Sequence, residues 1–121
     1  MIKLNHLNLV VRDVKSATDF FETYFNFKCI LLKGEHIISI LKGQDDFTLV
    51  LMPTVENDLN YPKAFHIGFM FDTQEEVNAL YEKLKAGEVQ VGESPKKIRN
   101  SYGFYFSFDT LMIEVGLNLQ E

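Results

Sequence analysis

The chain carries one order of predicted secondary structure twice, and this repeat limits its possible folds more than any other feature. Hydrophobic periodicity predicts a strand, a helix and three strands in residues 1–53, and the same order in residues 63–121. The polar segment 54–62 predicts a surface linker between these two modules. His6 and His66 align at an offset of 60 residues, which indicates an internal duplication. We therefore expect one α+β domain made of two tandem βαβββ modules.

The expected elements have recognisable ends. Asp13 predicts the N-terminal cap of a helix whose apolar stripe extends to Phe25. Thr73, with Glu76 three residues later, predicts a capping box at the start of a second helix, and Gly87 predicts its end. The predicted strands are residues 2–11, 27–33, 37–41, 47–52, 64–71, 89–91, 102–108 and 111–115.

Composition excludes several classes of protein. Hydrophobic residues make up 46% and charged residues 24% of the 121 positions, which is typical of a folded globular domain and unlike a disordered chain. The net charge of −5 predicts no binding to nucleic acid or to an anionic membrane. The single cysteine, Cys29, cannot form an internal disulfide. Because the sequence also has no signal pattern and no long apolar run, we expect a cytoplasmic protein.

Three polar residues recur on equivalent faces of the predicted strands. Side chains alternate across a strand, so His6 and Asn8 share the face opposite a uniformly apolar one. The same count places His66 and Glu114 opposite the apolar faces of their own strands. Two imidazoles and a carboxylate are a known ligand set for a divalent metal with open coordination positions. The residues alone leave open the alternative that each is an ordinary hydrogen-bonded side chain.

Short motifs occur in a fixed order along nearly the whole chain. They are LNHLNLVVRDV at 4–14, DFFETYFNF at 19–27, AFHIGF at 64–69, YGFYF at 102–106 and IEV at 113–115. In this order and spacing they resemble the vicinal oxygen chelate superfamily, which includes glyoxalase I, fosfomycin-resistance thiol transferases, extradiol dioxygenases and bleomycin-resistance proteins. The resemblance implies modules that form an open, cup-shaped mixed sheet with helices on its outer face.

The resemblance also implies a metal site. In metal-using members, one histidine from each half and a glutamate on the last strand bind the ion, and these positions are His6, His66 and Glu114 here. One divalent ion per site (Ni, Mn, Fe or Zn) would then polarise a chelated small-molecule substrate. The resemblance further implies a homodimer in which each site draws ligands from two chains.

Three other residues are candidate substrate contacts. Asn8 shares the face of His6 and has an amide that can hydrogen-bond a ligand. Arg99 lies among basic and polar residues before the YGFYF motif, where fosfomycin-resistance enzymes place groups around a phosphonate; a solvated loop is the alternative for this segment. Tyr105 is the candidate for the additional acid–base group that extradiol dioxygenases need, since the remaining histidine, His36, falls on a different strand. No residue is assigned a catalytic role.

Two departures from the family pattern bear on the reaction. Glyoxalase I has a second acidic residue on the last strand of the first half, and the equivalent position here is Val50. Valine can neither bind a metal nor move a proton, so we do not expect glyoxalase I activity. The turn from Asp109 to Glu114 is shorter than in the family, and a one-residue slip there would move Glu114 to the other face.

The expected function is a metal-dependent lyase, isomerase or transferase that acts on a small oxygenated substrate chelated to the metal. The alternative is a non-enzymatic binding protein of bleomycin-resistance type, which would hold a small aromatic or cationic molecule without metal or turnover. A third possibility is a protein whose cup is filled by side chains and which serves as an interaction module. Metal content separates the first hypothesis from the other two.

Overall fold

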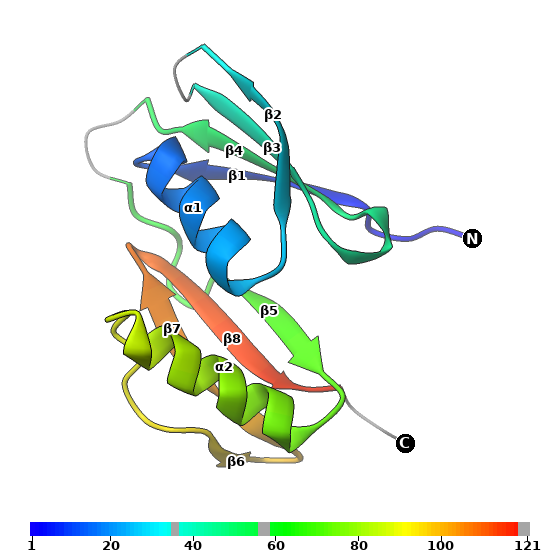
Figure 1. Ribbon diagram of the computed structural model, residues 1–121, viewed down its shortest axis with the longest axis vertical. Helices are drawn as coiled ribbons and strands as arrows, with labels where there is room; N and C mark the ends of the chain where they lie inside the picture. The colour runs from blue at the N-terminus through cyan, green and yellow to red at the C-terminus, as the bar shows by residue number, and fades with distance from the viewer. Residues whose placement is uncertain (35–36, 56–58, 119–121) are drawn as a thin grey trace. The chain divides into compact units, whose positions relative to one another are not determined.

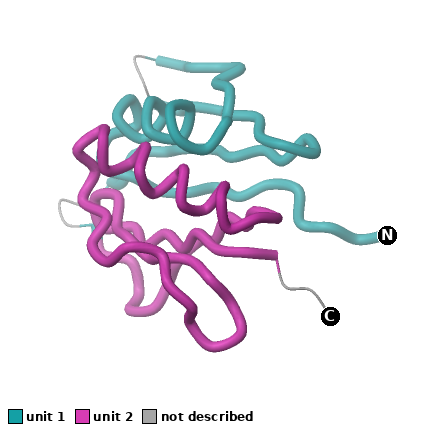
Figure 2. The backbone as a smooth tube through the Cα atoms, turned by 60° about the horizontal axis from the view of Figure 1, so that its bottom comes forward, with its two compact units in different colours: residues 1–59 teal, residues 60–121 magenta. Residues whose placement is uncertain are grey.

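The computed structural model describes residues 1–34, 37–55 and 59–118 in two compact units. Unit 1 is Met1–Leu59 and unit 2 is Asn60–Glu121 (Figure 2). Part of the predicted linker, residues 56–58, lies outside the described residues, as does His36. Each unit contains one four-stranded sheet with one helix against one of its faces (Figure 1).

Unit 1 has the order βαβββ. Its elements are β1 (His6–Val11), α1 (Val14–Tyr24), β2 (Lys28–Lys33), β3 (Ile38–Lys42), the 3₁₀ turn η1 (Gln44–Asp46) and β4 (Thr48–Pro53). The strands are arranged β1-β4-β3-β2, with β1 parallel to β4 and the other pairs antiparallel. The sheet is therefore mixed and open.

Unit 2 repeats this order. Its elements are β5 (His66–Phe71), α2 (Gln74–Ala86), β6 (Lys96–Ile98), β7 (Ser101–Phe108) and β8 (Leu111–Leu117). The strands are arranged β5-β8-β7-β6, and β5 is parallel to β8 as β1 is to β4. The predicted α+β class with tandem βαβββ modules is confirmed.

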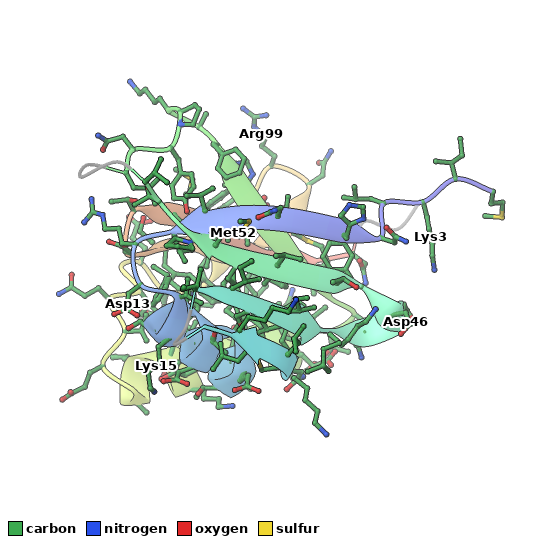
Figure 3. All side chains as sticks on the ribbon, turned by 90° about the horizontal axis from the view of Figure 1, so that it is seen from above. Lys3, Asp13, Lys15, Asp46, Met52 and Arg99 are labelled. Atoms are coloured by element: carbon green, nitrogen blue, oxygen red, sulfur yellow. The ribbon has the colours of Figure 1, made fainter. Side chains whose placement is uncertain are left out.

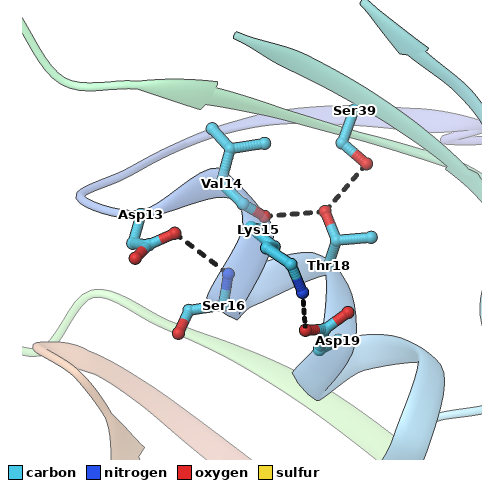
Figure 4. Close-up of polar contacts among 7 residues, drawn as sticks. All are labelled: Asp13, Val14, Lys15, Ser16, Thr18, Asp19 and Ser39. Carbon is cyan, nitrogen blue, oxygen red and sulfur yellow. Dashed lines mark hydrogen bonds and ion pairs between the residues drawn. The ribbon is translucent and has the colours of Figure 1, made fainter. Parts of the chain in front are cut away.

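Side-chain caps begin both helices, as predicted. The Asp13 carboxylate accepts a hydrogen bond from the Ser16 N–H at 3.0 Å (Figure 4). At α2, Thr73 and Glu76 form the reciprocal capping box. Such caps satisfy backbone donors that the first helical turn leaves without partners.

A buried polar contact fixes α1 on its sheet. The Thr18 hydroxyl donates to the Val14 carbonyl oxygen at 2.7 Å and lies 2.8 Å from the hydroxyl of Ser39 on β3 (Figure 4). Because the Thr18 proton is already used, Ser39 donates to the Thr18 oxygen. Ser39 is fully buried, so this bond satisfies a group that has no access to water.

The predicted strand at residues 89–91 is wrong, and the end of α2 explains the error. The helix closes with the Val89 N–H donating to the Leu84 carbonyl and the Glu88 N–H donating to the Lys85 carbonyl, both at 3.0 Å. These two bonds define a Schellman motif, which turns the chain back onto the helix. Val91 is buried there, and the strand that joins the sheet is Lys96–Ile98 instead.

The apolar cores lie between each helix and its sheet. Unit 1 buries Phe20 and Phe21 of α1 against Leu41, Leu49 and Leu51 of the strands. Unit 2 buries the stripe of α2 against β7 and β8, with Val77, Leu80, Tyr81, Leu84, Phe104, Phe106, Ile113 and Val115. Within the part of the chain that the structure describes, the opposite face of each sheet has no helix of its own unit on it. Among the described residues, no helix is long and apolar enough to span a membrane.

Candidate functional site

The helix-free face of unit 2 gathers the polar residues that the sequence pattern singled out. In the register of the sheet, Gly68 on β5, Glu114 on β8 and Tyr105 on β7 are direct neighbours across three strands. Their helix-side neighbours Phe104, Ile113 and Val115 are buried, which confirms the predicted face for Glu114 despite its short preceding turn. The same register shows that Tyr105, and not Phe104 or Phe106, lies on the Glu114 face.

His66 and Glu114 form a close pair on this face. The His66 Nε2 lies 3.3 Å from the Glu114 Oε1, and both side chains are partly exposed. The other ring nitrogen, Nδ1, lies 2.9 Å from the main-chain oxygen of Ala64. A carbonyl oxygen can only accept, so Nδ1 carries a proton and Nε2 is the atom turned toward the carboxylate.

Tyr105 completes this cluster. Its ring packs edge-on to the His66 ring, with centroids 5.9 Å apart. Its hydroxyl donates a hydrogen bond to the Glu114 carboxylate. Desolvation raises the pKa of the Tyr105 hydroxyl, the Glu114 charge and hydrogen bond raise it further, and Arg99 lowers it in part. The phenol therefore keeps its proton at neutral pH and is a hydrogen-bond donor.

A hollow of about 520 Å³ adjoins this cluster. It is lined by Ile98, Arg99, Asn100, Ser101, Tyr102, Gly103, Phe104, Tyr105, Glu114, Val115 and Gly116. Arg99 is exposed on the turn between β6 and β7 and extends away from the ribbon (Figure 3). The hollow thus presents a guanidinium, a phenol and a carboxylate, which can orient a small polar ligand.

The corresponding face of unit 1 carries His6 and Asn8. The His6 Nδ1 lies 2.8 Å from the Asn5 Oδ1, and the Asn8 amide donates to the Met52 sulfur at 3.2 Å. Val50 pairs in register with Asn8, so it lies on this same face, as the alternation predicted. No acidic side chain therefore stands at the position where glyoxalase I has one.

Four of the six predicted site residues lie close together in one unit, and the other two lie in the other unit. Arg99, Tyr105, His66 and Glu114 lie in unit 2, whereas His6 and Asn8 lie in unit 1. Within the described ranges, no group of three or more histidine, cysteine, aspartate or glutamate side chains surrounds one point. The joint role of His6, His66 and Glu114 stays a prediction.

Sequence reasoning missed the two residues that contact the Nδ1 atoms, Asn5 and Ala64. Asn5 directly precedes His6, but a polar residue beside a histidine is too common to indicate a contact. Ala64 acts through its main chain and has no side-chain pattern to recognise. A proline two positions before it, Pro62, was the available indication of a turn.

The repeated modules, with imidazoles and a carboxylate on helix-free faces, define the class of tandem βαβββ proteins. The chain belongs to the glyoxalase/bleomycin resistance protein/dioxygenase superfamily, whose model matches residues 3–115. No curated protein matches the chain.

Solved structures agree with this assignment. A possible glyoxalase from Bacillus cereus is 33% identical, with 96% of this chain and 99% of that chain covered and a TM-score of 0.84. The fosfomycin resistance protein FosX from Listeria monocytogenes is 20% identical, with 98% and 95% covered and a TM-score of 0.77. Lactoylglutathione lyase from Agrobacterium tumefaciens is 22% identical, with 95% and 92% covered and a TM-score of 0.71. The last two show similarity of fold.

Proposed function

We propose that this protein is a metal-dependent lyase, isomerase or transferase that acts on a small oxygenated substrate. In this proposal His6, His66 and Glu114 bind one divalent ion, which is Ni, Mn, Fe or Zn. The protein is a cytoplasmic homodimer. Family membership supports a small-molecule site of this kind, and the chemistry of the His66–Glu114 pair supports the binding of a metal ion there.

The observation that carries the proposal is the pair of donor atoms on unit 2. With Nδ1 protonated, a neutral His66 directs the Nε2 lone pair at the Glu114 oxygen 3.3 Å away. Two electron-pair donors face each other there and repel one another. A positive ion between them would attract both. A neutral imidazole nitrogen and a carboxylate oxygen are ordinary ligands of the divalent ions named above.

The surroundings of the pair also fit a metal. A Cβ added at Gly68 would lie 3.2 Å from the Met70 methyl carbon and 3.8 Å from the Glu114 Oε1, so the glycine keeps a further side-chain atom out of contact with the carboxylate. Three protein ligands would leave coordination positions for substrate oxygens. When bound, the ion supplies Lewis-acid stabilisation of negative charge on those oxygens.

The remaining polar groups have substrate-binding roles in this proposal. Arg99 binds an anionic part of the substrate through its guanidinium. The Tyr105 hydroxyl, whose one proton is donated to Glu114, accepts a hydrogen bond from a substrate hydroxyl group, and Asn8 contributes its side-chain amide. Because Val50 supplies no acid or base, the proposal excludes the glyoxalase I reaction.

Elemental analysis of purified, tag-free protein tests the proposal. We expect near-stoichiometric divalent metal in the wild type and little in Glu114→Gln, which keeps the side-chain volume but removes the anionic ligand. Glu93→Gln is the matched control, since Glu93 is an exposed carboxylate that pairs with Lys96 outside the site. Wild-type protein that neither contains nor takes up any of the four ions would overturn the proposal in favour of a binding protein of bleomycin-resistance type.

A further inference from the structure

Both candidate histidine ligands make the same kind of contact through Nδ1. The His6 Nδ1 lies 2.8 Å from the side-chain oxygen of Asn5, and the His66 Nδ1 lies 2.9 Å from the main-chain oxygen of Ala64. The two acceptors differ in origin, one from a side chain and one from the backbone. Each comes from a residue just before the strand that carries the histidine.

These contacts select one form of each imidazole. A neutral imidazole has one N–H and one lone pair, and the amide and carbonyl oxygens can only accept hydrogen bonds. The proton must therefore reside on Nδ1, which leaves the lone pair on Nε2. Acceptors of this kind on metal-bound histidines fix the tautomer and the orientation of the ring.

The acceptor groups are held in place by main-chain structure. The Asn5 carbonyl accepts a hydrogen bond from the Thr48 N–H at 2.9 Å, which anchors this residue to β4. At the second site, the Phe65 N–H donates to the Pro62 carbonyl at 2.9 Å, closing a tight turn with Ala64 at a φ of 76°. A positive φ is unfavourable for alanine, so the turn holds the backbone of this residue, and with it the carbonyl group, in a strained conformation.

We propose that Asn5 is a positioning residue that sets His6 in the tautomer with a free Nε2, and that the Ala64 carbonyl does the same for His66. This inference rests on the proposed function in one respect: Nε2 is the atom that binds the metal. The assignment of the tautomers themselves does not depend on a metal. Asn5 gives the direct test, because its side chain is exposed and its replacement disturbs no core.

The test compares Asn5→Ala with Asn5→Asp, which keeps an oxygen acceptor at the same distance along the side chain. Nitrogen-15 NMR of labelled histidine in the metal-free protein, under conditions where the imidazoles are neutral, reports which ring nitrogen carries the proton. The chain has three histidines, and His36→Gln removes the third set of signals. We expect His6 to be protonated on Nδ1 in the wild type and in Asn5→Asp, and to lose this preference in Asn5→Ala.

Titration with Mn²⁺ and Zn²⁺ then measures the consequence. We expect roughly 10- to 100-fold weaker binding in Asn5→Ala and no weakening in Asn5→Asp. An unchanged His6 tautomer in Asn5→Ala would overturn the inference, as would unchanged affinity together with a changed tautomer. If the tautomer responds as expected but the wild type binds neither ion, the metal role of Asn5 fails together with the proposed function, while the tautomer assignment stands.

Discussion

At the scale of single residues, the site depends on small side chains beside Glu114. Gly103 on β7 and Gly116 on β8 are paired in register on the same face as Glu114. A Cβ at Gly103 would lie 2.0 Å from the Val115 main-chain oxygen, so the two strands approach too closely for any side chain there. The shape of the hollow beside Glu114 therefore depends on Gly103, because any other residue there would force the backbone to move.

Replacing this glycine tests the close approach. We expect Gly103→Ala to destabilise the protein by about 3 kcal/mol or more, because overpacking against a backbone atom forces the strands apart. Gly92→Ala is the control for steric crowding, because no heavy atom lies within 4 Å of its added Cβ. Its φ of 64° should by itself cost about 1 kcal/mol. Urea denaturation measures both. Equal losses in the two variants would contradict the packing argument.

The ionisation of Tyr61 provides a prediction about pH. Burial raises the pKa of this phenol above its ordinary value of 10.0, and the nearby Asp109 charge raises it further. The folded protein then holds more protons than the unfolded chain near pH 10, so this contribution to stability is complete below about pH 10 and is lost as the pH rises through the folded value.

Asp109→Asn tests this effect, and asparagine tolerates the φ of 56° at that position. We expect the pKa of Tyr61 to fall only part of the way toward its ordinary value, because burial is the larger cause. Alkaline titration of tyrosine absorbance, with Tyr61→Phe to identify the signal among the five tyrosines, measures it. A full return to the ordinary pKa would show that charge, and not burial, dominates.

Alternation along single strands was enough to place several residues of the candidate site on the correct faces. His66, Glu114 and Val50 lie where the count placed them, because a strand with one buried face admits only one register. The face of Tyr105 could not be predicted, since aromatic side chains occur on both sides of β7. It became clear from the pairing of Tyr105 with Glu114 and from the packing of Phe104 against Tyr81 of α2, with ring centroids 5.2 Å apart.

At the scale of elements, a residue with a strained backbone conformation at the C-terminal end of α2 lowers the stability of the fold. Glu88 has a φ of 65° at the position of the Schellman motif that normally holds glycine. We expect Glu88→Gly to stabilise the protein by about 1 kcal/mol, because it relieves the left-handed strain and keeps both closing hydrogen bonds.

Glu88→Ala is the control for this prediction, since it removes the charge but keeps the Cβ that causes the strain. Thermal and urea unfolding compare the three proteins. If alanine stabilises the protein as much as glycine does, the gain comes from the charge near the helix end and not from the backbone.

The prediction of helices and strands succeeded where neighbouring residues determine the structure. It failed where contacts between residues distant in sequence determine it. The caps at Asp13 and Thr73 depend on residues three positions away, and both helices begin as predicted. The segment 89–91 is apolar enough for a strand, yet helix closure at Glu88 and the Tyr81 hydroxyl bond to the Gly92 carbonyl at 2.9 Å hold it beside α2. Strand Lys96–Ile98 is polar, and only its pairing with β7 identifies it.

At the scale of the whole molecule, the repeat was the most informative feature of the sequence. Two copies of one element order predicted two tandem βαβββ modules, and the observed strand arrangements β1-β4-β3-β2 and β5-β8-β7-β6 match element for element. Fold alone does not fix the reaction, because proteins that share it carry different sites. The identity of the substrate could not be predicted for this reason.

Metal binding should appear in the stability of the entire chain. An ion that binds only the folded state stabilises it by about 2.7 kcal/mol when its free concentration is 100 times the Kd. We expect added Mn²⁺ or Zn²⁺ to raise the Tm of the wild type and of Glu93→Gln, and to leave that of Glu114→Gln nearly unchanged. An equal rise in all three proteins would indicate binding elsewhere on the surface.

The ligand set is tested most directly by pulsed electron paramagnetic resonance of the Mn²⁺-loaded protein with nitrogen-15-labelled histidine, which counts the imidazoles bound to the ion. We expect two bound imidazoles in the wild type and in His36→Gln, and one in His6→Gln and in His66→Gln. A bound ion with no imidazole couplings, or with couplings that survive in both the His6 and the His66 variants, would contradict the proposed metal site.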